Sequence, residues 1–179
     1  MSWKAVVKFW FEGKGFQDWF FSKKPGFDSL VRKKFLKTYR AIVRGETAHW
    51  RTTPRGRLAE IIVLDQFSRN MFRDTPEMYR YDALALALAQ EALRAGADKK
   101  LTKDERMFMY VPFEHSESKK IQRESLRLFK QIWNKKNLKY AIDHKRIIDR
   151  FGRFPHRNAI LGRKSTAAEK KFMLRHKGY

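Results

Sequence analysis

The sequence contains no cysteine among its 179 residues. This absence excludes disulfide bonds, thiolate nucleophiles and zinc sites built from thiolates. The chain also lacks any apolar run close to the roughly 20 residues that a membrane-spanning helix needs. Its first residues do not show the basic-then-apolar pattern of a secretory signal. We therefore expect a cytoplasmic protein that does not insert into a membrane.

Acidic residues are scarce relative to basic ones. Nineteen Asp and Glu face 41 Lys and Arg, which gives a formal net charge of +22. Such a charge favours nonspecific binding to nucleic acid and other polyanions through electrostatics alone. The lysine excess falls mainly in scattered pairs, such as residues 33–34, 99–100, 119–120, 135–136 and 170–171. This scatter favours general surface charge over a shaped nucleic-acid groove, and the sequence leaves open whether the surplus is natural or engineered.

Apolar and aromatic residues are abundant and follow a helical period. The chain is 42% hydrophobic and 15% aromatic, which favours a packed globule over a disordered chain. The length fits a single domain over residues 1–179. No convincing strand alternation is present. We therefore predict an all-α fold, with about six to nine helices arranged as an array of antiparallel helix pairs.

Several helix boundaries are marked by capping residues and proline. Thr53-Pro54 and Thr75-Pro76 each place a hydroxyl cap before a proline, which favours a helix start. The second start predicts one helix from Pro76 to about Ala95. Pro112 is expected to end the helix that precedes it. The helix that follows the basic turn at residues 133–137 is expected to cover residues 138–151.

Charged residues enter one of these apolar helical faces. Asp65 continues the stripe of Leu58, Ile61 and Ile62, and Arg69 follows Asp65 by four residues. Unpaired charge on a buried face is costly, so both side chains need partners. Two interpretations stay open, an internal ion pair that joins helices and the wall of a binding pocket.

A constrained cationic segment occupies residues 151–163. It carries three arginines, a histidine and an asparagine between two glycines, with one proline, and its phenylalanines and Ile-Leu pair can anchor it to a core. Arginine forks on such a turn suit a carboxylate or a phosphate. Glu117 and Asp65 are the expected acidic counterparts. His115-x-Glu117 is too weak a pattern to indicate a metal site, and we predict neither a metal nor a cofactor.

Four sequence blocks together are similar to one known family. They are residues 64–70 (Leu-Asp-Gln-Phe-Ser-Arg-Asn), 112–117 (Pro-Phe-Glu-His-Ser-Glu), 150–163 and 50–58. Their order and spacing resemble the bacterial domain-of-unknown-function family numbered 924, over essentially the whole chain. The resemblance implies a helical fold like that of tetratricopeptide repeats and no established activity. The chain departs from the usual family members in its much more basic surface and basic C-terminal end.

Three functions are compatible with these patterns. The first is binding of a small anionic ligand in a polar pocket, with hydrolysis as a further option and enzymatic activity undecided. The predicted ligand-binding residues are Asp65, Arg69, Asn70, Arg153, Arg157 and Asn158. The candidates for general acid or base are His115, Glu117 and His156. The second function is a protein-interaction scaffold in which these polar blocks are structural ion pairs. The third is nonspecific nucleic-acid binding through the basic surface.

Overall fold

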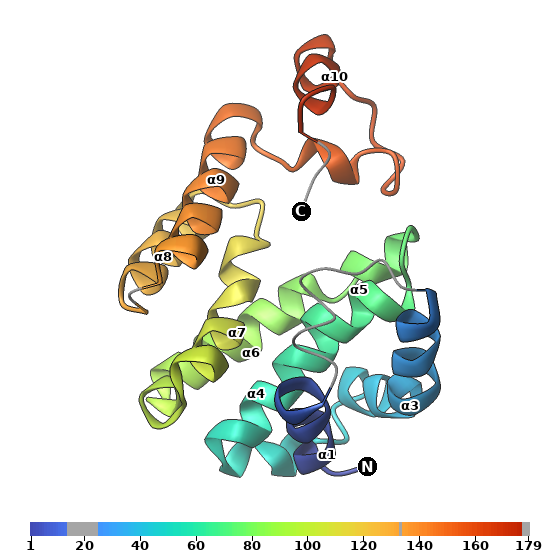
Figure 1. The fold of residues 1–179 in the computed structure, drawn as a ribbon, viewed down its shortest axis with the longest axis vertical. Coiled ribbons are helices and arrows are strands. Elements are labelled where there is room, and N and C mark those ends of the chain that lie inside the picture. The colour runs from blue at the N-terminus through green and yellow to red at the C-terminus, as the bar shows by residue number, and fades with distance from the viewer. Residues whose placement is uncertain (14–24, 133, 177–179) are drawn as a thin grey trace. The chain divides into compact units, whose positions relative to one another are not determined.

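The computed structural model describes residues 1–13, 25–132 and 134–176, and these ranges are helical without a strand (Figure 1). The predicted all-α fold is therefore confirmed. The chain divides into two compact units, which are described separately below. Unit 1 comprises residues 1–73 and 77–112, and unit 2 comprises residues 74–76 and 113–179. The expected likeness to tetratricopeptide repeats and the single-domain organisation stay predictions.

Unit 1 is built from short and medium helices. In chain order they are α1 (Trp3–Val7), a π-helical segment (Lys8–Glu12), α3 (Pro25–Val43), a 3-10 turn (Ala48–Thr52), α4 (Pro54–Ile62), a π-helical segment (Val63–Phe67), α5 (Ser68–Met71), a 3-10 turn (Pro76–Tyr79), α6 (Asp82–Arg94), a 3-10 turn (Ala97–Lys100) and α7 (Lys103–Glu114). The last two residues of α7 are assigned to unit 2. No helix in the described ranges is long and apolar enough to cross a membrane.

The core of unit 1 forms around α4, which packs against α1 and α6, while α3 packs against α5. Aromatic rings fill much of the space between these helices. The ring of Trp10 lies edge-on to Phe67 and Phe108, at centroid distances of 5.5 and 5.3 Å. All three side chains are buried. Because each buried aromatic stabilises by roughly 1.5–3 kcal/mol, this cluster fixes the helices that carry the polar residues of unit 1.

The start of α4 follows the sequence signal closely. The side chain of Thr53 accepts the N–H of Gly56 at 3.0 Å, and Pro54 occupies the first turn. Gly56 is required for a different reason. A Cβ atom at this position would lie 2.0 Å from the carbonyl oxygen of Trp50. The chain can therefore bring the 3-10 turn against α4 only when residue 56 has no side chain.

Unit 2 contains a helical hairpin and a short C-terminal helix. The hairpin consists of α8 (Lys119–Lys130) and α9 (Lys135–Phe151), which pack together in antiparallel orientation (Figure 1). Ser118 and Asn134 cap their N-termini through side-chain oxygens. A 3-10 turn (Pro155–Arg157) and α10 (Ala167–Met173) follow. Ile147, Ile148 and Phe154 form the core of this unit, with Phe151 and Phe172 packed against them.

Three predicted helix boundaries are wrong. The single helix expected over Pro76–Ala95 is a 3-10 turn followed by α6. The carbonyl of Met78 accepts the hydroxyl of Ser68 at 3.2 Å, so it is engaged outside its own helix. Pro112 lies within α7, which continues for two residues beyond it. A proline so near a C-terminus leaves few following residues to destabilise. The helix expected from residue 138 begins earlier, at Lys135, because Asn134 caps it.

Candidate functional site: the polar clusters of the two units

The cationic segment of unit 2 begins where α9 ends. Gly152 adopts a left-handed conformation with φ of 72°, and its N–H bonds the carbonyl of Ile148. This conformation strains most other residues, so glycine suits the position. Phe154 is then fully buried, and Pro155 opens the 3-10 turn. The segment is consequently anchored at both sides of Arg153.

Glu117 ties this segment to the residues before α8. Its carboxylate accepts the backbone N–H of Phe154 at 2.8 Å and both terminal nitrogens of Arg163 at 2.6 and 3.0 Å. Arg163 also donates to the carbonyl of Phe154 at 3.1 Å. Burial raises the pKa of Glu117, but the hydrogen bonds from Arg163 and Phe154 outweigh it and leave this pKa below its usual value. The carboxylate is therefore ionised and fully engaged in folding the segment.

Arg153 is bound by a second carboxylate. Its Nε and Nη2 atoms donate to Glu169 at 2.7 and 2.9 Å, and Nη2 also donates to the carbonyl of Lys164 at 2.9 Å. Glu169 in turn completes a capping box with Thr166 at the start of α10. The hydrogen bonds from Arg153 lower the pKa of Glu169 to about 2. This pair attaches α10 to the cationic segment.

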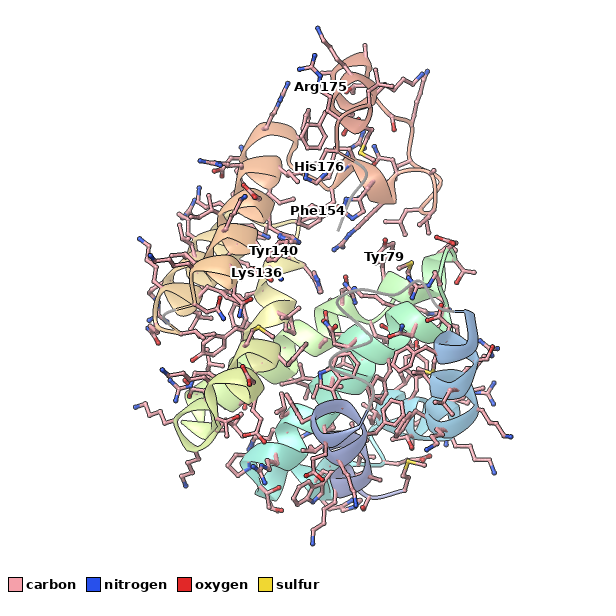
Figure 2. All side chains as sticks on the ribbon, in the orientation of Figure 1. Tyr79, Lys136, Tyr140, Phe154, Arg175 and His176 are labelled. Atoms are coloured by element: carbon pink, nitrogen blue, oxygen red, sulfur yellow. The ribbon has the colours of Figure 1, made fainter. Side chains whose placement is uncertain are left out.

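Histidines and an arginine gather around the ring of Phe154. We name this the histidine–arginine cluster, and its members are His115, His144, His156 and Arg157. The rings of His144 and His156 lie 5.5 and 5.6 Å from Phe154, and His115 lies 6.1 Å from His144. The guanidinium of Arg157 covers Phe154 at 4.6 Å and donates to the carbonyl of His115 at 3.0 Å. Figure 2 shows Phe154 among the side chains of this unit.

The imidazoles of His144 and His156 are held in the neutral form. Burial lowers the pKa of His144 to about 3, with His115 and Arg157 adding to the effect. Burial, followed by the charge of Arg157, lowers the pKa of His156 to about 3 as well. The Nδ1 atom of His144 lies 2.8 Å from the carbonyl of Tyr140, so this nitrogen carries the proton. At neutral pH His144 and His156 are therefore uncharged, whereas the guanidinium of Arg157 is positively charged.

Asn158 follows the cluster and is completely buried. Its side-chain nitrogen donates to the hydroxyl of Ser165 at 3.1 Å. Its Oδ1 atom is buried and has no hydrogen-bond partner within the described part of the chain. The geometry gives Asn158 a role in closing the loop between the 3-10 turn and α10.

Unit 1 carries its own buried polar cluster on the π-helical segment and α5. Arg69 donates through both terminal nitrogens to Asp82, each at 3.0 Å, and lies 3.3 Å from Asp65. Asp65 also accepts the amide of Gln66. Asp65 and Gln66 are each 1% exposed. The internal ion pair that the spacing allowed is present, and Asp82 joins it from α6.

A neighbouring interaction ties α5 to the start of α3. Asn70 donates to Asp28 at 2.8 Å, and Arg73 donates to both oxygens of the same carboxylate, at 2.5 and 2.9 Å. Asp28 stands in the first turn of α3, where a negative charge also favours the helix N-terminus. Asn70 is therefore used in joining two helices of unit 1.

The predicted site residues thus belong to two separate sets. Asp65, Arg69 and Asn70 lie in unit 1, whereas His115, Glu117, Arg153, His156, Arg157 and Asn158 lie in unit 2. Within unit 2 the expected pairing of Glu117 with the cationic segment is found. The convergence of both sets on one pocket stays a prediction, as do the ligand-binding and catalytic roles.

Sequence reasoning missed four residues that complete these clusters. Asp82 and Glu169 supply carboxylates, and Arg163 binds Glu117 although it was left out of the predicted set. His144 is buried, and its ring contacts Phe154 and His115. The spacing of Thr166 and Glu169 is that of a capping box, which gives no indication that Glu169 also binds Arg153. Within the described ranges, no group of three or more His, Asp or Glu is placed to hold a metal ion.

Comparison with known proteins identifies the family. The pattern of the family described as "Bacterial protein of unknown function (DUF924)" matches residues 6–177. The chain belongs to this family. A solved structure of a protein of unknown function from Agrobacterium tumefaciens is similar, with 37% sequence identity, 96% of each chain covered and a TM-score of 0.90. No curated protein matches the chain.

The DUF924 match includes residues of both units and all four blocks that carried the resemblance. The family resemblance is therefore confirmed. The similar structure is itself one of unknown function, so a functional argument has to come from the clusters of this chain.

Proposed function

We propose that this DUF924 protein binds a small anion, presented by a phosphate or carboxylate group, at the histidine–arginine cluster of unit 2. The proposal is carried by one observation. Arg157, His144 and His156 meet around Phe154, and His115 lies beside His144. The nearby carboxylates of Glu117 and Glu169 are bound by Arg163 and Arg153.

The charge balance of the cluster supports an anionic ligand. Two guanidinium groups, those of Arg157 and Arg163, act on the single carboxylate of Glu117. Both hydrogen-bonding oxygens of that carboxylate are already engaged by Arg163 and Phe154. The guanidinium of Arg157 is buried beside Phe154, in surroundings where electrostatic attraction is stronger than in water. A guanidinium fork is well suited to a phosphate or carboxylate.

The neutral imidazoles can contribute in two ways. A neutral imidazole donates one N–H, and an arriving anion would also favour its protonated form. Binding would therefore raise the pKa of His156 from about 3 and be coupled to proton uptake. His115 and His156 are only partly buried, so an anion can approach them. If hydrolysis accompanies binding, His156 with its raised pKa is the residue suited to general acid–base transfer.

A protein-interaction scaffold is the second candidate, and the bidentate ion pairs favour it. Arg153–Glu169, Arg163–Glu117 and Arg69–Asp82 each hold together elements far apart in sequence. This is the behaviour of structural ion pairs, whatever surface the scaffold presents. The two candidates differ at Arg157 and His156, because only anion binding requires these side chains to meet a ligand.

Titration of the full chain by NMR tests the proposal. Inorganic phosphate, then phosphorylated and carboxylated metabolites, are added while the imidazole 15N signals are followed. We expect saturable shifts in His156 and His115, with affinity that increases as the pH falls. His156→Gln and Arg157→Lys should each weaken binding at least tenfold, because they remove the protonatable imidazole and the bidentate fork, respectively. A turnover assay with each bound compound tests hydrolysis.

Arg153→Lys is the matched control, because it changes an arginine of the same segment whose donors are taken by Glu169 and Lys164. It should leave the affinity unchanged. Equal loss in Arg153→Lys and Arg157→Lys would show a general charge or folding effect and refute the proposal. The same conclusion would follow if no compound shifts the histidine signals. A stoichiometric protein partner whose binding survives His156→Gln would favour the scaffold.

A further inference from the structure

A cationic stripe runs along the outer face of α3 in unit 1. The helix carries five basic residues and one acid, and that acid, Asp28, is bound by Arg73 and Asn70. Lys33, Lys37 and Arg40 follow one another at spacings of four and three, so they project from one face of the helix. All three are exposed, and none forms an ion pair with another described residue. They cover about 10 Å along the helix axis.

A groove with aromatic walls adjoins this stripe. It has a volume of about 320 Å³ and lies between α3 and the residues that precede α6. Tyr39, Phe72 and Tyr81 supply rings to it, and the Tyr39 ring lies 5.1 Å from Phe72 and 5.9 Å from Tyr81. Phe72 and Tyr81 are only partly buried, so each keeps ring surface accessible to solvent. Arg32 and Arg40 line the groove beside these rings.

Basic residues outnumber acidic ones among the described residues that line the groove. Its one acidic residue, Glu77, accepts the hydroxyl of Tyr39 at 3.3 Å and is paired with Arg80 at 3.1 Å. Arg32 donates to the carbonyl of Met71 and covers the Phe72 ring at 5.3 Å. A second, wider hollow on the same helix is lined by Lys33, Lys34 and Lys37, with no acid among its described residues. Arg32 and Arg40 line both hollows, so the two are adjacent.

We infer that α3 and the adjoining groove bind single-stranded nucleic acid. The cations of the stripe would contact successive phosphates. The rings of Phe72 and Tyr81 would stack on unpaired bases, which is how proteins bind single strands without sequence preference. This surface is distinct from the anion site proposed in unit 2, so either proposal can fail without the other.

Two other anionic partners, a membrane surface and an acidic peptide, fit this surface less well. A membrane-binding helix exposes several large apolar residues beside its cations. On α3, Leu30 is the exposed large apolar side chain among the described residues, and it does not line either hollow. An acidic peptide would satisfy the lysines but would make no use of the partly exposed faces of the aromatic rings. A single-stranded nucleic acid can contact both features, with its phosphates at the cations and its bases on the rings.

Fluorescence anisotropy with labelled single strands of about twelve nucleotides tests the inference. RNA and DNA strands of the same sequence are compared with their duplexes and with heparin as a competitor, over a range of salt concentrations. The stripe variant combines Lys33→Gln, Lys37→Gln and Arg40→Gln. Its control combines Lys119→Gln, Lys120→Gln and Lys130→Gln, which removes the same charge from exposed positions of α8.

The stripe variant should lose at least tenfold in affinity for single strands. The slope of log affinity against log salt should fall in magnitude by about 2, since each lost phosphate contact contributes about 0.7. The control should change the affinity less than threefold. Equal losses in the two variants would reduce the interaction to bulk charge and overturn the inference.

The aromatic walls are tested separately with Phe72→Leu and Tyr81→Leu, which keep apolar bulk while removing the ring. Each should weaken single-strand binding about tenfold, because stacking on one base is lost. Heparin binding should not change, since heparin has no bases. The inference is wrong if the duplex binds more tightly than the single strand. It is also wrong if the ring variants leave both single-strand and heparin binding unchanged, or weaken the two equally, because the groove then does not bind bases. Circular dichroism confirms that each variant is folded.

Discussion

Arg163 binds Glu117 through both of its terminal nitrogens, across 46 positions of the sequence. The same carboxylate accepts the N–H of Phe154, and the same guanidinium donates to the carbonyl of Phe154. The Arg163–Glu117 ion pair therefore binds both the N–H and the carbonyl of Phe154, and it fixes the backbone at the start of the cationic segment. This arrangement explains why the segment holds its shape without a regular helix between residues 158 and 166.

Removing this carboxylate should destabilise the protein. Glu117→Gln leaves Arg163 without its charged partner in a site where both side chains are about a quarter exposed. Because solvent screens part of the interaction, we expect a loss of about 1–2 kcal/mol in the free energy of unfolding, less than for a fully buried pair. Urea denaturation followed by circular dichroism measures it. Glu124→Gln, which disrupts an exposed pair with Arg127, should cost less than about 1 kcal/mol; equal losses would contradict a special role for Glu117.

The sequence was informative where interactions are local. The spacing of Asp65 and Arg69 allowed an ion pair within one helix, and the Thr-Pro signal placed the start of α4 correctly. It was also informative where a family pattern linked distant blocks, since Glu117 was expected to face the cationic segment. The all-α class followed from apolar periodicity, which depends on residues within a few turns of each other.

Partners brought together by tertiary packing could not be predicted in the same way. Asp82 binds Arg69 only because α6 packs against the π-helical segment, and Glu169 meets Arg153 only because α10 turns back toward the end of α9. In the structure each carboxylate lies in the first turn of its own helix, and no local pattern links it to a distant arginine. The gathering of His115, His144 and His156 depends on the antiparallel hairpin and on Phe154, neither of which any local pattern specifies.

The histidine–arginine cluster should make stability depend on pH from about 6.5 downward, so the dependence begins above the range where carboxylates titrate. The pKa of His144 is about 3 in the folded protein, against an ordinary value of 6.5. As the pH falls below 6.5, the unfolded chain takes up a proton that the folded chain does not, so stability is complete above pH 6.5 and declines toward pH 3. The limiting slope is about 1.4 kcal/mol per pH unit for each such histidine.

Chemical denaturation of the wild type and of His144→Gln between pH 7 and pH 5 checks this expectation. The variant cannot titrate at this position, so the difference in stability between the two proteins should shrink as the pH falls. A constant difference would show that the pKa of His144 is the same in the folded and unfolded states. NMR of the imidazole nitrogens at pH 5 gives an independent reading, because a neutral His144 protonated on Nδ1 has a distinct pair of 15N shifts.

Glu169 should dominate a second acid transition at lower pH. Its pKa is lowered to about 2, first by the hydrogen bonds from Arg153, against an ordinary value of 4.5. A lowered carboxylate pKa stabilises the fold above pH 4.5, and this stabilisation is lost as the pH falls from 4.5 toward 2. Glu169→Gln should therefore lower the melting temperature at pH 6 and flatten its dependence on pH below 4.5. The measurement is thermal melting across that range, and a parallel displacement of the whole curve would argue against this assignment.

Arg69 should be the most sensitive charged position of unit 1. It lies between Asp65 and Asp82, and Arg69→Met would leave two carboxylates facing each other in a site that is 1% exposed at Asp65. An uncompensated buried charge costs roughly 3–5 kcal/mol, so this variant should unfold far more readily in urea. Adding Asp65→Asn and Asp82→Asn to Arg69→Met removes the repulsion and should recover part of the loss. Without that recovery, the cost would come from packing around the arginine stem, and the ion pair would contribute little.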